Sequence, residues 1–69
     1  MDFKVGMTVV YDDSNHRVVG KIKEIKEMDK YRYLIEVQES DVSGMEEMLV
    51  HKDNEKYLKR RILAVSENE

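Results

Sequence analysis

The sequence predicts one mostly β domain, in which five strands form a strongly bent sheet and one short helical turn precedes the last strand. Two amphipathic segments, Val19–Ile25 and Tyr31–Val37, are joined by a short polar turn and predict the middle of that sheet. Gly20, inside the first segment, allows tight coiling or the close approach of another strand. The 69 residues suit one domain, and the absence of cysteine leaves apolar packing and strand pairing to hold it together.

The first strand is predicted from Met7 to Asp12, because apolar and polar residues alternate there. Val9 and Tyr11 fall on the same face as Met7. The polar run that follows, ending at Asn15, predicts a turn, since short polar side chains bond to their own backbone.

The second strand is predicted from Arg17 to about Glu27. Its apolar positions change phase, because Ile25 lies three residues after Ile22 instead of two. A bulge near Lys23-Glu24 would return Ile25 to the inner face. Bulges bend a strand in the way that a small barrel requires.

The third and fourth strands are predicted from Tyr31 to Gln38 and from Glu47 to His51, on either side of a polar loop at residues 39–44. In the third strand one face carries Tyr31, Tyr33, Ile35 and Val37, and the other carries Arg32, Leu34, Glu36 and Gln38. In the fourth strand the inner residues Met48 and Val50 lie opposite Leu49. The central structural prediction is joint burial of Ile22, Ile25, Ile35 and Val37.

The C-terminal third supports two interpretations. Apolar residues recur at helical spacing between Tyr57 and Val65, and Asp53 has the chemistry of a helix cap, which would make the fold α+β, a β-meander with a C-terminal helix. Alternatively, residues 54–60 form one helical turn and residues 62–65 form a closing fifth strand. We favour the closing strand, because a four-stranded sheet with an open edge needs covering or closing. The domain is then expected to span residues 1–66, with a frayed tail at 67–69.

Several motifs resemble one class of small barrel. They are Phe3-x-Val5-Gly6-Met7-x-Val9, Gly20-x-Ile22-x-x-Ile25, Tyr33-Leu34-Ile35-Glu36-Val37, and Met48-Leu49-Val50-His51 followed by Tyr57-Leu58 and Ile62. Together they are similar to the SH3-like (Src-homology-3-like) barrels, and within that class to the Tudor-like and KOW-like groups. The resemblance covers nearly the whole chain. It implies a five-stranded barrel that binds RNA, DNA, ribosome or polymerase surfaces, or protein tails, and it implies no catalysis.

Charge alternates along the chain, although the net charge is only −3. Residues 16–32 are mainly basic, residues 36–47 hold five acids and no base, and residues 50–61 are mainly basic again, which predicts a bipolar surface. No apolar run approaches the roughly 18 residues needed to cross a bilayer. The first residues lack the basic-then-apolar pattern of a secretory signal, so we expect a cytoplasmic protein with no membrane partner.

The loop containing Asp12, Asp13, Ser14 and His16 combines acid, hydroxyl and imidazole groups. A catalytic nucleophile needs a base held by a rigid orienting group, which neighbours in an exposed turn rarely provide. The loop also offers oxygen ligands, but Val18 stands where a calcium loop starting at Asp13 has glycine. We therefore predict ordinary turn chemistry, no enzymatic activity, no metal site and no cofactor.

A Tudor-like cage for a methylated ammonium group needs about three aromatic rings that converge at one rim. Tyr11 and Tyr31 are candidates for such a rim. Phe3 and Tyr33 are expected in the core, which favours tyrosines packed at the ends of the barrel with wet hydroxyls.

Two binding surfaces remain as hypotheses. The favoured one binds a protein partner, which suits an accessory factor of a nucleoprotein machine, and uses apolar residues left on the outer face: Leu34, Leu49 and Leu63, with Tyr11 and Tyr31. The alternative is a KOW-like RNA or DNA surface, which uses bases of strand two and of residues 52–61: Lys21, Lys23, Lys26, Arg32, Lys56, Lys59, Arg60 and Arg61. The acidic pI of about 5.4 argues against unaided binding to nucleic acid, and we expect a monomer.

Overall fold

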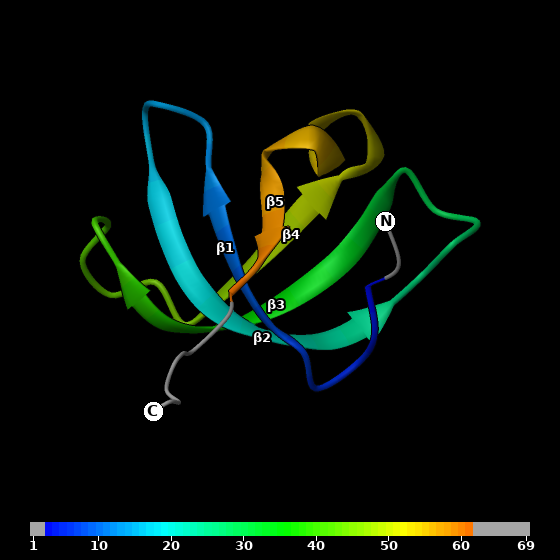
Figure 1. Cartoon of the computed structure of the whole chain (residues 1–69), viewed down its shortest axis with the longest axis horizontal. Coiled ribbons are helices and arrows are strands. Elements are labelled where there is room, and N and C mark those ends of the chain that lie inside the picture. The colour runs from blue at the N-terminus through cyan, green and yellow to red at the C-terminus, as the bar shows by residue number, and fades with distance from the viewer. Residues whose placement is uncertain (1–2, 62–69) are drawn as a thin grey trace.

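The computed structural model describes residues 3–61, and these form one antiparallel sheet of five strands with one short 3-10 helix (Figure 1). In chain order the elements are β1 (Thr8–Asp12), β2 (Arg17–Ile25), β3 (Tyr31–Ser40), β4 (Glu47–His51), η1 (Lys52–Tyr57) and β5 (Leu58–Arg60). The order across the sheet is β4-β3-β2-β1-β5. The mostly β class and the short helix before the last strand are confirmed.

The sheet is not closed into a barrel. Within residues 3–61, β4 and β5 are its two edges, and no residue of one pairs with a residue of the other. The helix η1 connects them. The sheet curls instead of closing, and β2 and β3 are strongly bent along their length (Figure 1).

The curl is built into β2 and β3. Their pairing shifts register twice, between Val19 and Gly20 and between Ile22 and Glu24. The second shift confirms the predicted bulge near Lys23. Gly20 permits the first bend, because a Cβ built at this position would lie only 2.2 Å from the carbonyl oxygen of Glu36.

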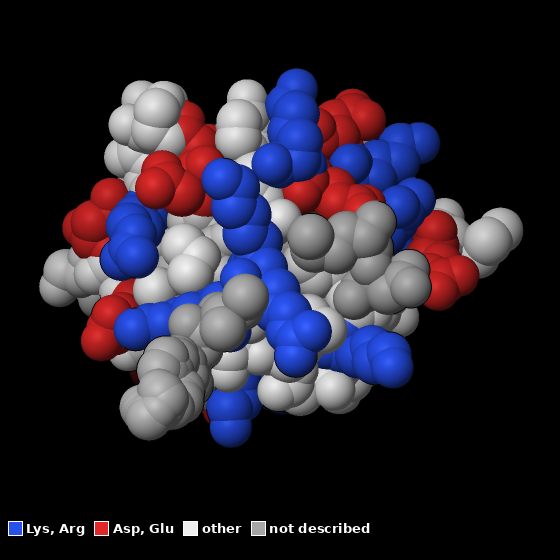
Figure 2. Space-filling view, viewed as in Figure 1, with Lys and Arg blue, Asp and Glu red and all other residues white. Residues whose placement is uncertain are grey.

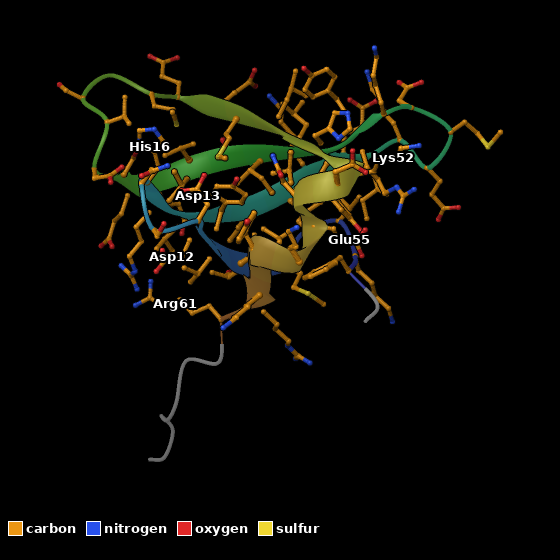
Figure 3. All side chains as sticks on the ribbon, turned by 90° about the horizontal axis from the view of Figure 1, so that it is seen from above. Asp12, Asp13, His16, Lys52, Glu55 and Arg61 are labelled. Atoms are coloured by element: carbon orange, nitrogen blue, oxygen red, sulfur yellow. The ribbon has the colours of Figure 1, made fainter. Side chains whose placement is uncertain are left out.

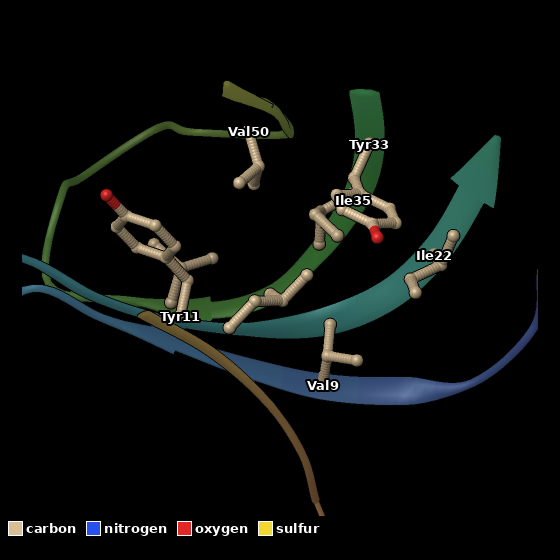
Figure 4. Packing of buried hydrophobic residues seen from close by; sticks show 8 residues of the cluster. Val9, Tyr11, Ile22, Tyr33, Ile35 and Val50 are labelled. Atoms are coloured by element: carbon tan, nitrogen blue, oxygen red, sulfur yellow. The ribbon is translucent and has the colours of Figure 1, made fainter. Parts of the chain in front are cut away.

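The core fills the hollow of the curled sheet, where the side chains of Val9, Ile22, Ile35 and Val50 are each 1% exposed (Figure 4). Ile22 and Ile35 are cross-strand partners. Two further residues of the predicted core are only partly buried and pack against this cluster, namely Ile25 and Val37. Alternation therefore identified the inner face of β1, β2 and the middle of β3 correctly.

A further bulge lies in β3, where Tyr31 pairs with His51 and Tyr33 pairs with Val50. Arg32 is the extra residue between them, so the strand changes phase at this point. The sequence placed Tyr31 on the inner face with Tyr33. That prediction was wrong, because the bulge turns Tyr31 outward, where it is 48% exposed.

The C-terminal region departs from both interpretations of the sequence. The helix runs from Lys52 to Tyr57. His51 caps its start, because the Nδ1 of His51 accepts a hydrogen bond from the backbone N–H of Asp53 at 3.0 Å. The chain then returns to the sheet as β5, in which Leu58 pairs with Tyr11 and is 3% exposed. The predicted helical turn over residues 54–60 is correct for residues 54–57, but that turn and the alternative C-terminal helix capped by Asp53 are both wrong for residues 58–60. The predicted strand at 62–65 lies outside the described residues.

Candidate functional site

The outer face of β3 and β4 carries a block of four large side chains. Leu34 and Leu49 are direct cross-strand partners, and Tyr31 pairs with His51 in the neighbouring row. The Tyr31 and His51 rings meet edge to face, with centroids 5.3 Å apart. Leu49 is 53% exposed, and Leu34 and His51 are half-buried. These four residues are named the leucine patch below. Leu63 lies outside the described residues.

Ion pairs border the leucine patch. Lys23 Nζ lies 2.6 Å from Glu47 Oε2, and this hydrogen bond is the main reason that the pKa of Lys23 lies above its ordinary value. Lys26 Nζ lies 3.9 Å from Glu24 Oε1, and Glu24 is the cross-strand partner of Leu34. The apolar block is therefore framed by paired charges, as the rim of a protein interface commonly is.

The bulged residue Arg32 extends toward η1. Its Nη1 donates a hydrogen bond to Glu55 Oε1 at 3.0 Å, while its buried Nε finds no partner among the described residues. Burial, and then the nearby Glu55 carboxylate, raise the pKa of Tyr33. Arg32 and Tyr33 line a groove of about 540 Å³ together with Phe3, Ile25 and Met28. Three bases of the expected nucleic-acid stripe, Lys23, Lys26 and Arg32, are thus engaged with acids of the same chain.

The second basic set lies on and next to β5. Lys56, Lys59, Arg60 and Arg61 are all exposed, and within residues 3–61 none of them belongs to an ion pair. Lys56 Nζ lies 5.4 Å from the centroid of the Tyr57 ring. Lys and Arg side chains form a band down the middle of the face on which β5 lies (Figure 2). Lys21 of β2 is also exposed and outside any ion pair in this part of the chain.

In the acidic loop between β1 and β2, the carboxylate of Asp13 is hydrogen-bonded to the backbone of the loop itself. Asp13 Oδ1 accepts hydrogen bonds from the N–H groups of Asn15 and His16 at 3.0 and 2.9 Å, and its Oδ2 accepts from the Tyr11 hydroxyl at 3.0 Å. The His16 N–H is the main cause of a lowered Asp13 pKa. His16 Nδ1 lies 3.9 Å from Asp41 Oδ1. No group of metal-binding side chains forms within residues 3–61, and the loop lies at the end of the molecule opposite Lys52 and Glu55 (Figure 3).

The aromatic rings do not converge at one rim. Phe3 packs edge to face on Tyr33 with centroids 5.4 Å apart, and Tyr11 packs on Tyr57 at 6.0 Å. Tyr11 is 4% exposed, so its ring belongs to the core and we leave it out of any surface site. Tyr31 is separate from both pairs and contacts His51.

His51 is the member of the leucine patch that the sequence did not suggest. It joins the patch because the Arg32 bulge brings Tyr31 opposite to it, and no sequence signal marks that bulge. Within residues 3–61 there is no helix with the length and apolar character needed to cross a membrane. Comparisons with protein-family models, with curated proteins and with solved structures found no match to this chain.

Proposed function

We propose that this chain is a small, non-catalytic docking module that binds a protein partner through the leucine patch. The observation that carries the proposal is the bulge at Arg32. It sets Tyr31 and His51 beside Leu34 and Leu49, so four large side chains form one continuous outer surface.

The chemistry of the patch suits an interface core. Tyrosine and leucine at half exposure offer apolar area that a partner can remove from water, and the tyrosine adds a hydroxyl for orientation. A cluster of this kind differs from scattered surface leucines, which are normal on any protein.

The charges around the patch indicate the charge that a partner surface should carry. Glu36 is exposed, belongs to no ion pair within residues 3–61, and is the cross-strand partner of Glu47. We therefore propose a partner surface with an apolar centre and a basic rim. The SH3-like character, with its Tudor-like or KOW-like affinity, belongs to the same proposal, as does a role as an accessory factor of a cytoplasmic nucleoprotein machine. The order of the elements and the helix between β4 and β5 support it.

The test is affinity capture from the lysate of the source cell, with immobilised wild-type protein and two variants. Leu34→Ser removes an apolar residue from the patch, and Val5→Ser removes one of comparable size that is 63% exposed elsewhere. We expect Leu34→Ser to lower recovery of the partner about tenfold, the loss typical of an interface core residue, and Val5→Ser to leave it unchanged. Equal recovery with both variants would reject the patch as the docking site.

The second candidate is binding of an acidic polymer, RNA or DNA, by the bases of β5. The observation in its favour is that Lys56, Lys59, Arg60 and Arg61 are not engaged by acids of the described chain. A nitrogen–proton NMR titration with short RNA and DNA tests it. Salt-sensitive shifts at residues 56–61 that disappear in Lys59→Ser would support this function, because phosphate contacts weaken as salt rises. Absence of shifts at low salt would exclude it.

A further inference from the structure

Within residues 3–61, the strand β4 pairs with another strand along one edge only, and its other edge is free. Its neighbours in the described structure are β3 on one side and η1 at its end. Two backbone hydrogen bonds fix which of its backbone groups face β3: Glu46 O accepts from Val37 N at 2.9 Å, and Lys52 N donates to Lys30 O at 2.7 Å. Because bonding residues alternate along an antiparallel strand, Met48 also faces β3.

The backbone groups of the intervening residues therefore face outward. These are the N–H and C=O groups of Glu47 and Leu49 and the N–H group of His51, spaced two residues apart; the C=O of His51, as the N-cap residue, accepts the first hydrogen bond of η1. Such a row is a template for another strand, and proteins commonly protect it with charged side chains. The edge strand β5 is protected in this way, since Lys59 and Arg60 occupy two of its three positions. The centre of β4, Met48-Leu49-Val50, carries no charge.

The sequence of this edge is complementary to itself when it is read antiparallel. With Leu49 as the centre, Glu46 stands opposite Lys52, Glu47 opposite His51, and Met48 opposite Val50. Acids thus meet bases, and apolar residues meet apolar residues, at every position from 46 to 52. Opposite charges across a strand pair stabilise it, whereas like charges destabilise it.

We propose that the free edge of β4 pairs antiparallel with β4 of a second copy of this chain, around a two-fold axis at Leu49. In this register the N–H and C=O of Leu49 bond to Leu49 of the second copy, and the C=O of Glu47 accepts from the N–H of His51 of the second copy. Each bond occurs twice around the axis, as a closed two-fold interface requires. The proposed dimer differs from the monomer that the sequence predicts.

The side chains already present at the edge fit that register. His51 uses Nδ1 to accept the Asp53 N–H, so the hydrogen of the neutral ring sits on Nε2 and is available as a donor. Glu47 bonds Lys23 through Oε2, which leaves Oε1 to accept from His51 of the second copy. A slip that centred the axis on Met48 would place Glu47 opposite Leu49, and it would lose both the Glu46–Lys52 pair and the Glu47–His51 pair.

Pairing of this kind goes beyond the docking function. It joins the two leucine patches edge to edge, so that Leu34, Leu49 and their counterparts form one row across four strands. A partner that binds the patch would then meet a two-fold surface. The dimer does not depend on that partner, and its test uses purified protein alone.

Amide hydrogen exchange and sedimentation of the wild-type protein give the first test, from about 10 µM to about 1 mM, the range in which a weak contact of this size forms. We expect the mass to rise toward that of a dimer. We expect the amides of Leu49 and His51 to become protected over the same range, while Met48 and Val50 are protected throughout. A monomer with unprotected odd-numbered amides at the highest concentration would overturn the proposal.

Reversing the charges at residues 46 and 52 tests the register of the proposed β4–β4 pair. Glu46→Lys places two lysines opposite Lys52 residues, and Lys52→Glu places two glutamates opposite Glu46 residues, so each variant alone should dimerise about tenfold more weakly or worse. An equal mixture of the two variants restores both pairs in a mixed dimer, which we expect to match the wild type. Both positions are exposed, so the variants should fold normally.

The matched control exchanges two other exposed charges, Glu39→Lys and Lys30→Glu, separately and mixed. These should leave the dimer unchanged in every combination. If the mixture of Glu46→Lys and Lys52→Glu stayed monomeric, or if the control pair behaved in the same way as the test pair, the proposed register would be rejected. Recovery of a docking partner in the Leu34→Ser experiment is independent of either result.

Discussion

Tyr11 joins the core to the turn between β1 and β2. Its ring is buried against Tyr57, and its hydroxyl donates to the Asp13 carboxylate that also accepts two backbone N–H groups of the turn. One carboxylate therefore satisfies a phenol at the rim of the core and holds the turn in place. The sequence predicted the turn and the inner position of Tyr11, because polar clustering and alternation show both. It did not predict their connection, since a hydroxyl-to-carboxylate bond two residues apart leaves no periodic trace.

Because of this connection, the free energy of unfolding is expected to depend on pH in the alkaline range. Burial, followed by the Asp13 hydrogen bond, raises the pKa of Tyr11 from 10.0 to about 12. Between these values the unfolded chain releases the phenolic proton and the folded protein retains it, so the free energy of unfolding must fall as pH rises above about 10. Tyr11→Phe should weaken this decline, and Tyr31→Phe, at an exposed site, should not. Urea unfolding at several alkaline pH values measures it, and an unchanged decline in Tyr11→Phe would contradict the assignment.

At the scale of elements, two bulges of similar geometry differ in whether the sequence shows them. The bulge near Lys23 appears as a phase change between Ile22 and Ile25, because polar residues lie on either side of each isoleucine. The bulge at Arg32 is hidden, because Tyr31 and Tyr33 read as one uninterrupted alternation. Tyrosine suits either face of a sheet, so its pattern could not show that one ring turns outward. The leucine pair of the patch was predictable from alternation alone, and the tyrosine–histidine pair was not.

The bend of β2 against β3 depends on Gly20. In Gly20→Ala the new Cβ would lie 2.2 Å from the backbone oxygen of Glu36 and 2.8 Å from Cγ2 of Ile35, so both strands must move. We expect a loss of about 1–3 kcal/mol in the free energy of unfolding, or more if the strands separate, as for overpacked cores. Lys21→Ala, on the exposed side of the same strand, should change it by less than about 0.5 kcal/mol. Chemical denaturation of the two variants measures both values, and equal midpoints would show that the close approach is absent in solution.

At the scale of the whole molecule, one small core holds the sheet, and no disulfide is available because the chain has no cysteine. Ile35 lies in the middle of that core, opposite Ile22 and beside Met48 of β4. Ile35→Ala should lower the free energy of unfolding by about 2–5 kcal/mol, which is a large part of what a domain of this size possesses. Val5→Ala, at a residue that is 63% exposed, serves as the control. A denaturation midpoint that Ile35→Ala left unchanged would refute this register.

The sequence predicted the first four strands and the inner face well, because alternation is a direct consequence of a half-buried strand. It was less successful after His51. Tyr57 and Leu58 begin a run of apolar residues at helical spacing. Leu58 nevertheless belongs to a strand that pairs with β1, which lies far from β4 in the sheet. That choice is made by a distant partner, and local periodicity does not contain it. The open edge of β4 follows from the same cause, because β5 completes its pairing on β1.

The pairing of β1 with β5 also orders the folding reaction. The strand pairs β2–β3 and β3–β4 are hairpins, in which the two strands are close along the chain. In the β1–β5 pair, by contrast, Tyr11 and its partner Leu58 are separated by most of the described residues. Closing that large loop costs more chain entropy than closing a hairpin, and β5 contributes only three residues in return. The meander is therefore expected to form first during folding. Strand β5 is expected to pair with β1 last during folding and to separate from it first during unfolding. Until β5 pairs, both edge strands of the partly folded sheet, β4 and β1, would have unpaired backbone groups.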